Sequence, residues 1–220
     1  MITKLAKATW LTLALGGALV ACHPVDVQHA DPMRAAPREP LGEARLSLKW
    51  KWVSADRATE IAPQEFAAPV VSGDTVFMGS AGGQFVALRA ANGAIRWRKQ
   101  LGPVGAAPVI DRGMLYVGTS DGLLICLEAN TGVERWRYVG RGPVDQPPVI
   151  AGETVVFANE ADQVIALDAL KGTFKWQYKT ETPDDTVLRG HAGVTVDGDL
   201  LYTGFSNGNL VALRRDTGTV

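Results

Sequence analysis

Apolar and polar residues alternate along short segments from about residue 64 onward, and the breaks between the segments are rich in Gly, Asn and Asp. An alternation of period two places successive side chains on opposite faces of an extended chain, and breaks of this composition are typical of hairpin turns. In one stretch the pattern predicts strands over residues 107–111, 114–120, 123–128 and 134–139. Sequential hairpins of this kind predict a four-stranded antiparallel sheet.

This pattern repeats along the chain with a period of about forty residues. Four segments align without gaps, and they cover residues 74–93, 113–132, 153–172 and 199–218. One column holds a small residue in each segment, namely Ala87, Cys126, Ala166 and Ala212. The last column holds glycine, namely Gly93, Gly132, Gly172 and Gly218. Tryptophan follows this glycine by four residues in three of the repeats, at Trp97, Trp136 and Trp176.

The repeat predicts the fold class, an all-β propeller with about four blades, each a four-stranded antiparallel sheet. One sheet cannot bury both of its faces alone, whereas sheets packed radially around an axis do so, and a four-stranded unit of about forty residues is typical of a propeller blade. The small column leaves room for a neighbouring sheet, and the glycine column predicts a tight turn with positive φ. Each tryptophan is predicted on an outermost strand, where its ring seals one sheet against the next.

The N-terminal part of the chain is predicted to lie outside this fold. Lys4 and Lys7 precede an apolar run over residues 10–20, which is shorter than the ~20 residues of a membrane span and is typical of a signal peptide. The run ends in Leu19-Val20-Ala21-Cys22, which resembles the bacterial lipobox. We therefore expect Cys22 to carry a lipid anchor that contains palmitate. The alternative is an ordinary secretory signal with a chance cysteine.

These features predict three parts. Residues 1–21 form a lipoprotein signal peptide, and residues 22–45 form a flexible tether because they are rich in proline and lack apolar periodicity. Residues 46–220 hold the propeller repeats.

Composition and charge narrow the function classes. The formal net charge is −1 at pH 7, which argues against a nucleic-acid binder because such proteins need a basic excess to neutralise phosphates. Two cysteines exclude a disulfide-rich scaffold, and three histidines disfavour a multi-histidine metal centre.

Cys126 is predicted to be a small core residue, since no basic or histidine neighbour is apparent to activate its thiol. Glu181, Asp184 and Asp185 lack the ligand spacing of a calcium loop. We therefore predict no catalytic residue, no metal site and no cofactor.

The opening strands of the repeats carry a further motif, a small residue or proline followed by Pro-Val. It occurs as Ala68-Pro69-Val70, Ala107-Pro108-Val109 and Pro147-Pro148-Val149. Together with the small, glycine and tryptophan columns, this motif resembles the pyrroloquinoline-quinone-like (PQQ-like) propeller repeat. A lipoprotein signal and a tether in front of such repeats resemble the BamB family of outer-membrane assembly lipoproteins. The resemblance covers about residues 46–220.

The resemblance implies a non-catalytic scaffold, anchored to the outer membrane and facing the periplasm, that aids folding and insertion of outer-membrane proteins. The implied partner is the central barrel-assembly protein (BamA-like), contacted through its periplasmic domains. Residues 187–190, Val-Leu-Arg-Gly, are similar to that family's Ser-Leu-Arg-Gly segment, which implies that Leu188 and Arg189 bind the partner. The alternative is that both residues only support a loop between blades. Thr186 stands where the family often has leucine.

Two questions stay open in the sequence. The family has eight blades, so this chain is either a fragment or a four-bladed ring that residues 46–53 close by completing the fourth sheet. The function is either the assembly scaffold or another role. The alternatives are an envelope propeller lipoprotein that binds a different ligand or partner, and a fragment of a PQQ-dependent dehydrogenase. The dehydrogenases that the repeat resembles carry a vicinal Cys-Cys pair, which this sequence lacks.

Overall fold

The structure, a computed structural model, describes residues 47–53, 67–180 and 192–220. The chain divides into two compact units, residues 1–47 and residues 48–220, and every described strand lies in the second unit. The predicted signal peptide, the tether and Cys22 lie outside the described residues. Among the residues that are described, no helix is long and apolar enough to cross a membrane.

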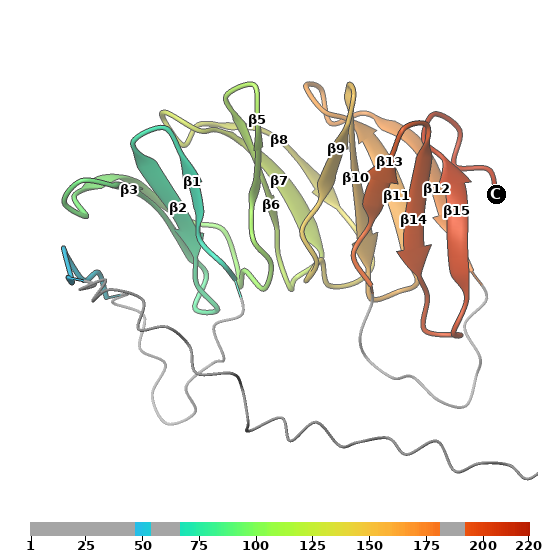
Figure 1. Cartoon of the computed structure of the whole chain (residues 1–220), viewed down its shortest axis with the longest axis horizontal. Helices are drawn as coiled ribbons and strands as arrows, with labels where there is room; N and C mark the ends of the chain where they lie inside the picture. Colours follow the sequence, from blue (N-terminus) through green and yellow to red (C-terminus); the bar gives the residue numbers. More distant parts are fainter. Residues whose placement is uncertain (1–46, 54–66, 181–191) are drawn as a thin grey trace, which may run out of the picture. The chain divides into compact units, whose positions relative to one another are not determined.

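The described strands form four antiparallel sheets (Figure 1). The first sheet contains β1 (Val70–Ser72), β2 (Thr75–Gly79), β3 (Gln84–Arg89) and β4 (Ile95–Gln100). The second contains β5 (Val109–Asp111), β6 (Met114–Gly118), β7 (Leu123–Glu128) and β8 (Glu134–Val139). The third contains β9 (Val149–Ala151), β10 (Thr154–Asn159), β11 (Gln163–Asp168) and β12 (Phe174–Lys179). The fourth contains β13 (Thr195–Asp197), β14 (Leu200–Gly204) and β15 (Leu210–Arg214).

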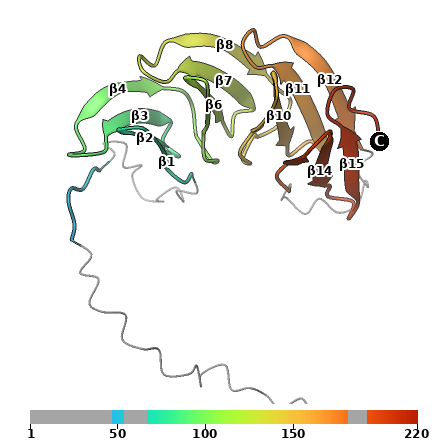
Figure 2. The same ribbon diagram turned by 45° about the horizontal axis from the view of Figure 1, so that its top comes forward.

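These sheets confirm the predicted all-β propeller architecture. Neighbouring strands within each sheet are consecutive in the chain and antiparallel, as a series of hairpins requires. The sheets stand side by side in chain order (Figure 2), and the first strand β9 contacts both β5 of the sheet before it and β13 of the sheet after it. Each tryptophan strand, β4, β8 or β12, therefore lies at the outer edge of its sheet. Two of the predicted strands were too long. The strand predicted over residues 107–111 begins at Val109, because Pro108 lacks a backbone N–H. The strand predicted over residues 114–120 ends at Gly118, because Thr119 belongs to a turn.

Apolar side chains from neighbouring sheets interlock to form the core. Ala87 and Phe77 of the first sheet pack in one cluster with Leu115 and Leu127 of the second. Equivalent clusters join the second sheet to the third and the third to the fourth. Ala87, Cys126 and Ala166 are fully buried, which confirms the prediction that the small column faces a neighbouring sheet. The leucine that follows the small residue packs on the opposite face, toward the preceding sheet.

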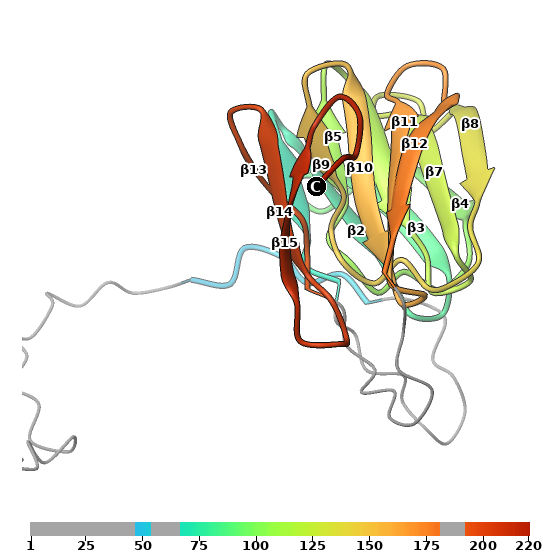
Figure 3. The ribbon, with the colours of Figure 1, turned by 90° about the vertical axis from the view of Figure 1, so that its right-hand side faces the viewer.

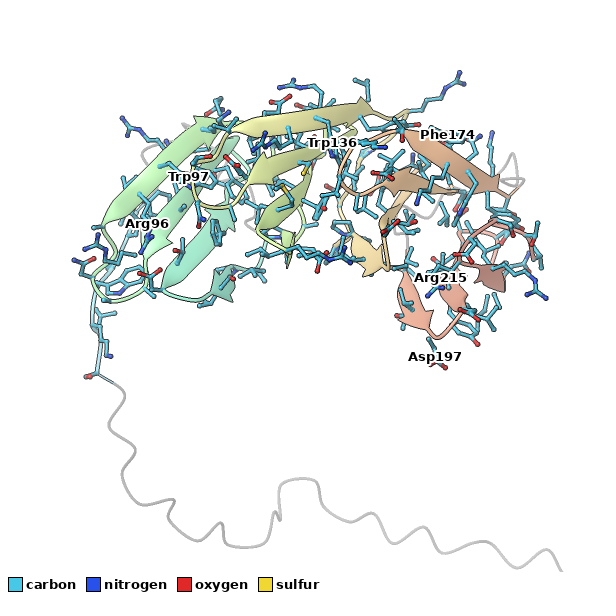
Figure 4. All side chains as sticks on the ribbon, turned by 90° about the horizontal axis from the view of Figure 1, so that it is seen from above. Arg96, Trp97, Trp136, Phe174, Asp197 and Arg215 are labelled. Carbon is cyan, nitrogen blue, oxygen red and sulfur yellow. The ribbon has the colours of Figure 1, made fainter. Side chains whose placement is uncertain are left out.

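A contact between a tryptophan and a turn joins each sheet to the next. The indole Nε1 of Trp97 donates a hydrogen bond of 2.9 Å to the carbonyl oxygen of Ala129 in the turn between β7 and β8. The same turn contains Gly132 at φ 71°, where a Cβ atom would lie 2.8 Å from the Trp97 ring. Figure 4 shows Trp97 and Trp136 lying between successive sheets. The glycine column thus needs both a positive φ, as predicted, and the absence of a side chain beneath the indole.

The same tryptophan–turn contact occurs four times in the described chain. Its other members are Trp136 with Ala169 at 3.0 Å, Trp176 with Arg215 at 2.9 Å, and Trp50 with Ala90 at 2.9 Å. Trp50 lies in residues 47–53, which pair with no described strand. Trp50 therefore stands where the outermost strand of a sheet preceding the first would place its tryptophan. In a closed four-bladed ring the fourth sheet would precede the first, so the Trp50 contact fits that alternative as well, whereas the structure shows no pairing between residues 47–53 and β15.

Candidate functional site

One edge of the sheets gathers the turns between the second and third strands together with the connections from each sheet to the next (Figure 1). We call this edge the connection rim. It comprises the turns at residues 80–83, 119–122, 160–162 and 205–209 and the connections at residues 101–108 and 140–148.

Each connection on this rim is bonded to both sheets that it joins. The Val104 N–H donates to the Ser80 carbonyl oxygen at 3.1 Å, and the Ser120 N–H donates to the Pro103 carbonyl oxygen at 2.8 Å. The next connection repeats both bonds, from Val144 to Thr119 at 3.0 Å and from Glu160 to Pro143 at 3.0 Å. Because backbone groups make these bonds, the rim is a rigid frame for the side chains that it presents.

A cavity of about 670 Å³ opens between the first three sheets on this rim. Its polar lining includes Ser120, Asp145, Gln146 and Glu160. The Ser120 hydroxyl donates a hydrogen bond of 2.6 Å to Asp145 Oδ1, and the absent side chain of Gly105 leaves room for that carboxylate. The hydroxyl, carboxylate and amide groups that line this cavity could form hydrogen bonds with a polar ligand.

A second polar link closes the rim between the third and fourth sheets. Asp162 is buried and accepts hydrogen bonds from the backbone N–H of Ser206, at 3.0 Å, and from its hydroxyl. Asp162 has φ 53°, in the left-handed region that the other three repeats fill with glycine. The sequence shows Asp162 as the odd residue of that column, but it does not show the partner, which lies 44 residues further along the chain.

The sequence-predicted partner residues Leu188 and Arg189 lie outside the described residues, as do Glu181, Asp184 and Asp185. The ends of the connection that carries them are hydrogen-bonded to the fourth sheet. Asn207 donates from its side-chain amide to Thr180 Oγ1 at 2.9 Å, and Thr203 Oγ1 donates to the Ala192 carbonyl oxygen at 3.3 Å.

The buried titratable groups of the core are inert. Burial raises the pKa of the Cys126 thiol to about 12, which keeps it protonated and unreactive at neutral pH. Burial also raises the pKa of Tyr116 well above its usual range, and its hydroxyl donates to the Ala169 carbonyl oxygen at 3.1 Å. Among residues 47–53, 67–180 and 192–220, no three His, Cys, Asp or Glu side chains are grouped to hold a metal ion.

Comparisons with known proteins agree with this architecture. The family model described as outer membrane protein assembly factor BamB matches residues 44–104 and 97–220. The crystal structure of BamB from Moraxella catarrhalis superposes with a TM-score of 0.63 at 25% identity, over 72% of this chain and 48% of that protein. The chain thus spans about half the length of that BamB. No curated protein sequence matches the chain.

Two further solved structures share the fold. Quinohemoprotein alcohol dehydrogenase ADHIIG from Pseudomonas putida HK5 has a TM-score of 0.62 at 20% identity, over 79% of this chain and 35% of that enzyme. The computationally designed Ika4 protein has a TM-score of 0.60 at 15% identity, over 76% of this chain and 98% of that one. At these identities the two likenesses show the fold alone. The family match extends over all four sheets, and the chain therefore belongs to the family of the outer membrane protein assembly factor BamB.

Proposed function

We propose that this chain is a non-catalytic scaffold lipoprotein of the outer-membrane β-barrel assembly machinery. In this role Cys22 carries the lipid that anchors it to the outer membrane, and the propeller faces the periplasm. The observation that carries the proposal is membership of the BamB family over residues 44–220. The bonded connection rim supports it, because a scaffold needs loops that keep one conformation while a partner binds.

In the proposed mechanism the periplasmic domains of the barrel-assembly protein bind along the connection rim. Leu188 supplies an apolar anchor and Arg189 a charged hydrogen-bonding anchor, since arginine is among the residues that dominate interface energies. The connection that carries both residues leaves the described fold at Thr180 and re-enters it at Ala192, and both of these ends are hydrogen-bonded to the fourth sheet. Fixed ends reduce the conformational entropy that binding of this segment loses.

A pull-down of the barrel-assembly protein by the full chain tests this mechanism. Leu188→Ala combined with Arg189→Ala should lower recovery of the partner at least tenfold. The matched control is Leu170→Ala combined with Lys171→Ala, a leucine–cation pair in the exposed turn between β11 and β12. Equal recovery with both double variants would show that residues 188 and 189 do not bind the partner.

Cys22 can be tested separately by labelling cells with radioactive palmitate. We expect label in the wild-type chain and none in Cys22→Ala, and we expect only the wild-type chain in the outer-membrane fraction. Label that persists in the variant would rule out Cys22 as the lipid anchor.

A PQQ-dependent dehydrogenase role is the second candidate, and the likeness to ADHIIG favours it only at the level of the fold. The chain's two cysteines, Cys22 and Cys126, are not adjacent. The test is addition of pyrroloquinoline quinone and Ca²⁺ to the purified chain, followed by an alcohol and a redox dye. We expect no bound quinone and no dye reduction, and quinone binding to a stoichiometry near one per chain would replace the scaffold proposal.

A further inference from the structure

The outermost strands carry a regular set of cations on either side of each tryptophan. The first row, one residue before the tryptophan, holds Lys49, Arg96, Arg135 and Lys175. The second row, one residue after it, holds Lys51, Arg98, Arg137 and Gln177. All eight residues are exposed, because the tryptophan between them points toward the next sheet and alternate residues of a strand point to opposite faces. Two rows of cations therefore run across successive outer strands.

These rows lie on one side of the unit. We call residues 48–53 together with β4, β8 and β12 the outer-strand surface, since Trp50 makes the same tryptophan–turn contact as Trp97. In Figure 2, β4, β8 and β12 follow the outer arc of the row of sheets, and in Figure 3, β4 and β8 lie on the side away from β9 and β13. Both β4 and β8 have an outer segment on either side, so the exposure of their cations does not depend on what lies beyond the ends of the row.

Charge on the described residues is divided between this surface and the rest. The surface holds nine cations, which are the seven of the two rows together with Lys99 and Lys179. The carboxylates that contact them are Asp74 at Arg96, Glu128 at Arg135 and Glu134 at Arg137. Nine cations against these three carboxylates leave a formal charge of +6, whereas the other described residues hold six cations and ten carboxylates. The outer-strand surface is thus basic on a chain whose formal net charge is −1.

The cations of this surface are accessible to a ligand. Arg98 and Lys179 have no ion-pair partner among the described residues. The side chains of Arg135 and Arg137 are paired, but they are still 49% and 51% exposed. A guanidinium group has five N–H donors, of which a carboxylate occupies at most a part. Paired and unpaired cations alike can therefore donate to phosphate oxygens.

Exposed apolar side chains lie among these cations. Ile95, Val139 and Phe174, in β4, β8 and β12, are 49%, 69% and 53% exposed. Basic residues mixed with exposed apolar ones are typical of protein surfaces that lie at the boundary between lipid headgroups and acyl chains. The composition of the surface therefore favours a membrane over a purely ionic ligand.

We propose that the outer-strand surface binds the anionic phospholipid headgroups of a membrane. The two rows of cations contact the headgroup phosphates, and the apolar side chains among them lie against the outer part of the acyl layer. The row of sheets is curved (Figure 2) and a bilayer is nearly flat, so the contact covers neighbouring outer strands. We assign it to residues 48–53, β4 and β8, because these hold seven of the nine cations.

The position of this surface in the chain agrees with a membrane contact. Residues 48–53 come three residues after the predicted tether, and Lys49 and Lys51 are the first cations of the described residues. This step rests on the proposed function, in which Cys22 carries a lipid. An anchor at the start of the tether holds the surface at a high effective concentration near the bilayer, so a modest electrostatic attraction is enough to orient the propeller. The connection rim shares no residue with this surface, and the two contacts do not compete.

Flotation with lipid vesicles tests the proposal on the full chain with Cys22→Ala, in which no acyl chain contributes. One set of vesicles contains phosphatidylcholine alone, and the other contains phosphatidylcholine and phosphatidylglycerol in equal amounts. At about 0.1 M salt we expect at least tenfold stronger binding to the anionic vesicles than to the neutral ones. We expect this preference to disappear at about 0.5 M salt, because the screening length becomes shorter.

A charge-neutralising variant locates the contact. Lys51→Gln combined with Arg98→Gln and Arg137→Gln removes the cations of the second row, and it should weaken binding to the anionic vesicles at least tenfold because each cation adds to the attraction. A variant that keeps the charge, Arg98→Lys combined with Arg137→Lys, should bind like the unsubstituted chain. Unchanged urea midpoints would show that both variants are folded.

The matched control removes three exposed cations from other parts of the unit. It carries Arg112→Gln, Lys171→Gln and Arg214→Gln, which lie in two turns and at the end of β15. It has the same net charge as the test variant, and it should weaken binding less than threefold. Residues 1–45 are identical in all of these chains, so any contribution of that segment to vesicle binding is the same in each.

Three results would overturn the proposal. Equal binding of the unsubstituted chain to both kinds of vesicle would show that no anionic headgroup is recognised. Equal weakening in the test variant and the control would show that net charge acts, rather than this surface. If anionic vesicles are ignored and the test variant alone loses the barrel-assembly protein in the pull-down, the occupant is an acidic protein surface. Because the chains in flotation carry no lipid anchor, failure of the Cys22 or Leu188 tests would leave the vesicle result standing.

Discussion

The indole N–H of Trp97 donates to the backbone carbonyl oxygen of Ala129, and this bond crosses from one sheet to the next. The ring of Trp97 lies over Gly132, three residues beyond that carbonyl group. One contact therefore explains two columns of the repeat, because the tryptophan needs a glycine beneath it and the turn supplies the acceptor. Its four occurrences show that the outer edges of successive sheets are joined by a directional bond in addition to apolar packing.

Replacement of Trp136 by phenylalanine should destabilise the fold. The change removes the hydrogen bond to Ala169 and part of a large ring that seals the second sheet against the third. We expect a loss of about 1–3 kcal/mol in the free energy of unfolding, combining one hydrogen bond with a partly filled cavity. The measurement is the midpoint of urea unfolding. Phe174→Leu, at a side chain that is 53% exposed, serves as the control and should shift the stability by less than about 0.5 kcal/mol. Equal midpoints for the two variants would contradict the sealing role.

Two glycines with positive φ separate the cost of the backbone from the cost of the collision with tryptophan. At Gly132, φ is 71° and a Cβ atom would meet the Trp97 ring, whereas at Gly113, φ is 78° and a Cβ atom would meet nothing within 4 Å. Gly113→Ala should therefore cost only the left-handed backbone term of about 1–2 kcal/mol. Gly132→Ala should cost about 1–3 kcal/mol more, because the ring must move. Urea midpoints of both variants test this. A difference below about 0.5 kcal/mol between their free energies of unfolding would mean that the Trp97 ring moves aside at little cost.

Much of the fold could be predicted from the repeat, because its columns record local geometry. The turn at Gly93 follows from the need for positive φ, and the burial of Cys126 follows from a column otherwise filled by alanine. The strands β7 and β8 were predicted to the residue. The collision between Gly132 and Trp97 could not be predicted, since it depends on how closely one sheet approaches the next.

The polar links on the connection rim were less accessible to sequence analysis. Ser120 and Asp145 are 25 residues apart, and Asp162 and Ser206 are 44 residues apart. Which polar residues meet across that distance depends on the rotation between neighbouring sheets, and no column of the repeat encodes it. Asp162 was nevertheless visible as an exception to a glycine column, and an exception of this kind is a useful signal for a special contact.

Replacement of Asp162 should affect the free energy of unfolding in two opposing ways, through the backbone conformation and through the lost hydrogen bonds. Asp162→Ala keeps the left-handed φ on a residue with a Cβ atom and removes both hydrogen bonds from Ser206. Asp162→Gly removes the same bonds but relieves the backbone, so it should be more stable than the alanine variant by about 1 kcal/mol. Both should be less stable than the wild type, by about 1–3 kcal/mol for alanine, since the part-buried hydrogen bonds from Ser206 are lost. The readout is thermal or urea unfolding, and an alanine variant as stable as the glycine variant would argue that φ at this position carries no strain.

Alkaline pH should destabilise the protein through Cys126. Its pKa rises from an ordinary value of 9.0 to about 12 in the folded state because the thiol is buried. The folded chain therefore keeps a proton that the unfolded chain loses, so the stabilisation is complete below pH 9 and is lost as the pH rises toward 12. Over this window the thiol alone should lower the free energy of unfolding by about 1.4 kcal/mol per pH unit.

Cys126→Ala isolates this effect, because alanine fills the same column in the other three repeats and removes only the titrating group. Urea midpoints of the wild type and the variant should be compared at pH 8 and pH 10.5, with Tyr116 and the lysines present in both. The variant should lose less stability between these pH values, by about 2 kcal/mol. An equal loss of stability in the wild type and the variant would show instead that water reaches the thiol. The folded wild type would then react quickly with a thiol reagent at pH 8.5. A thiol buried between the second and third sheets should not react in this way.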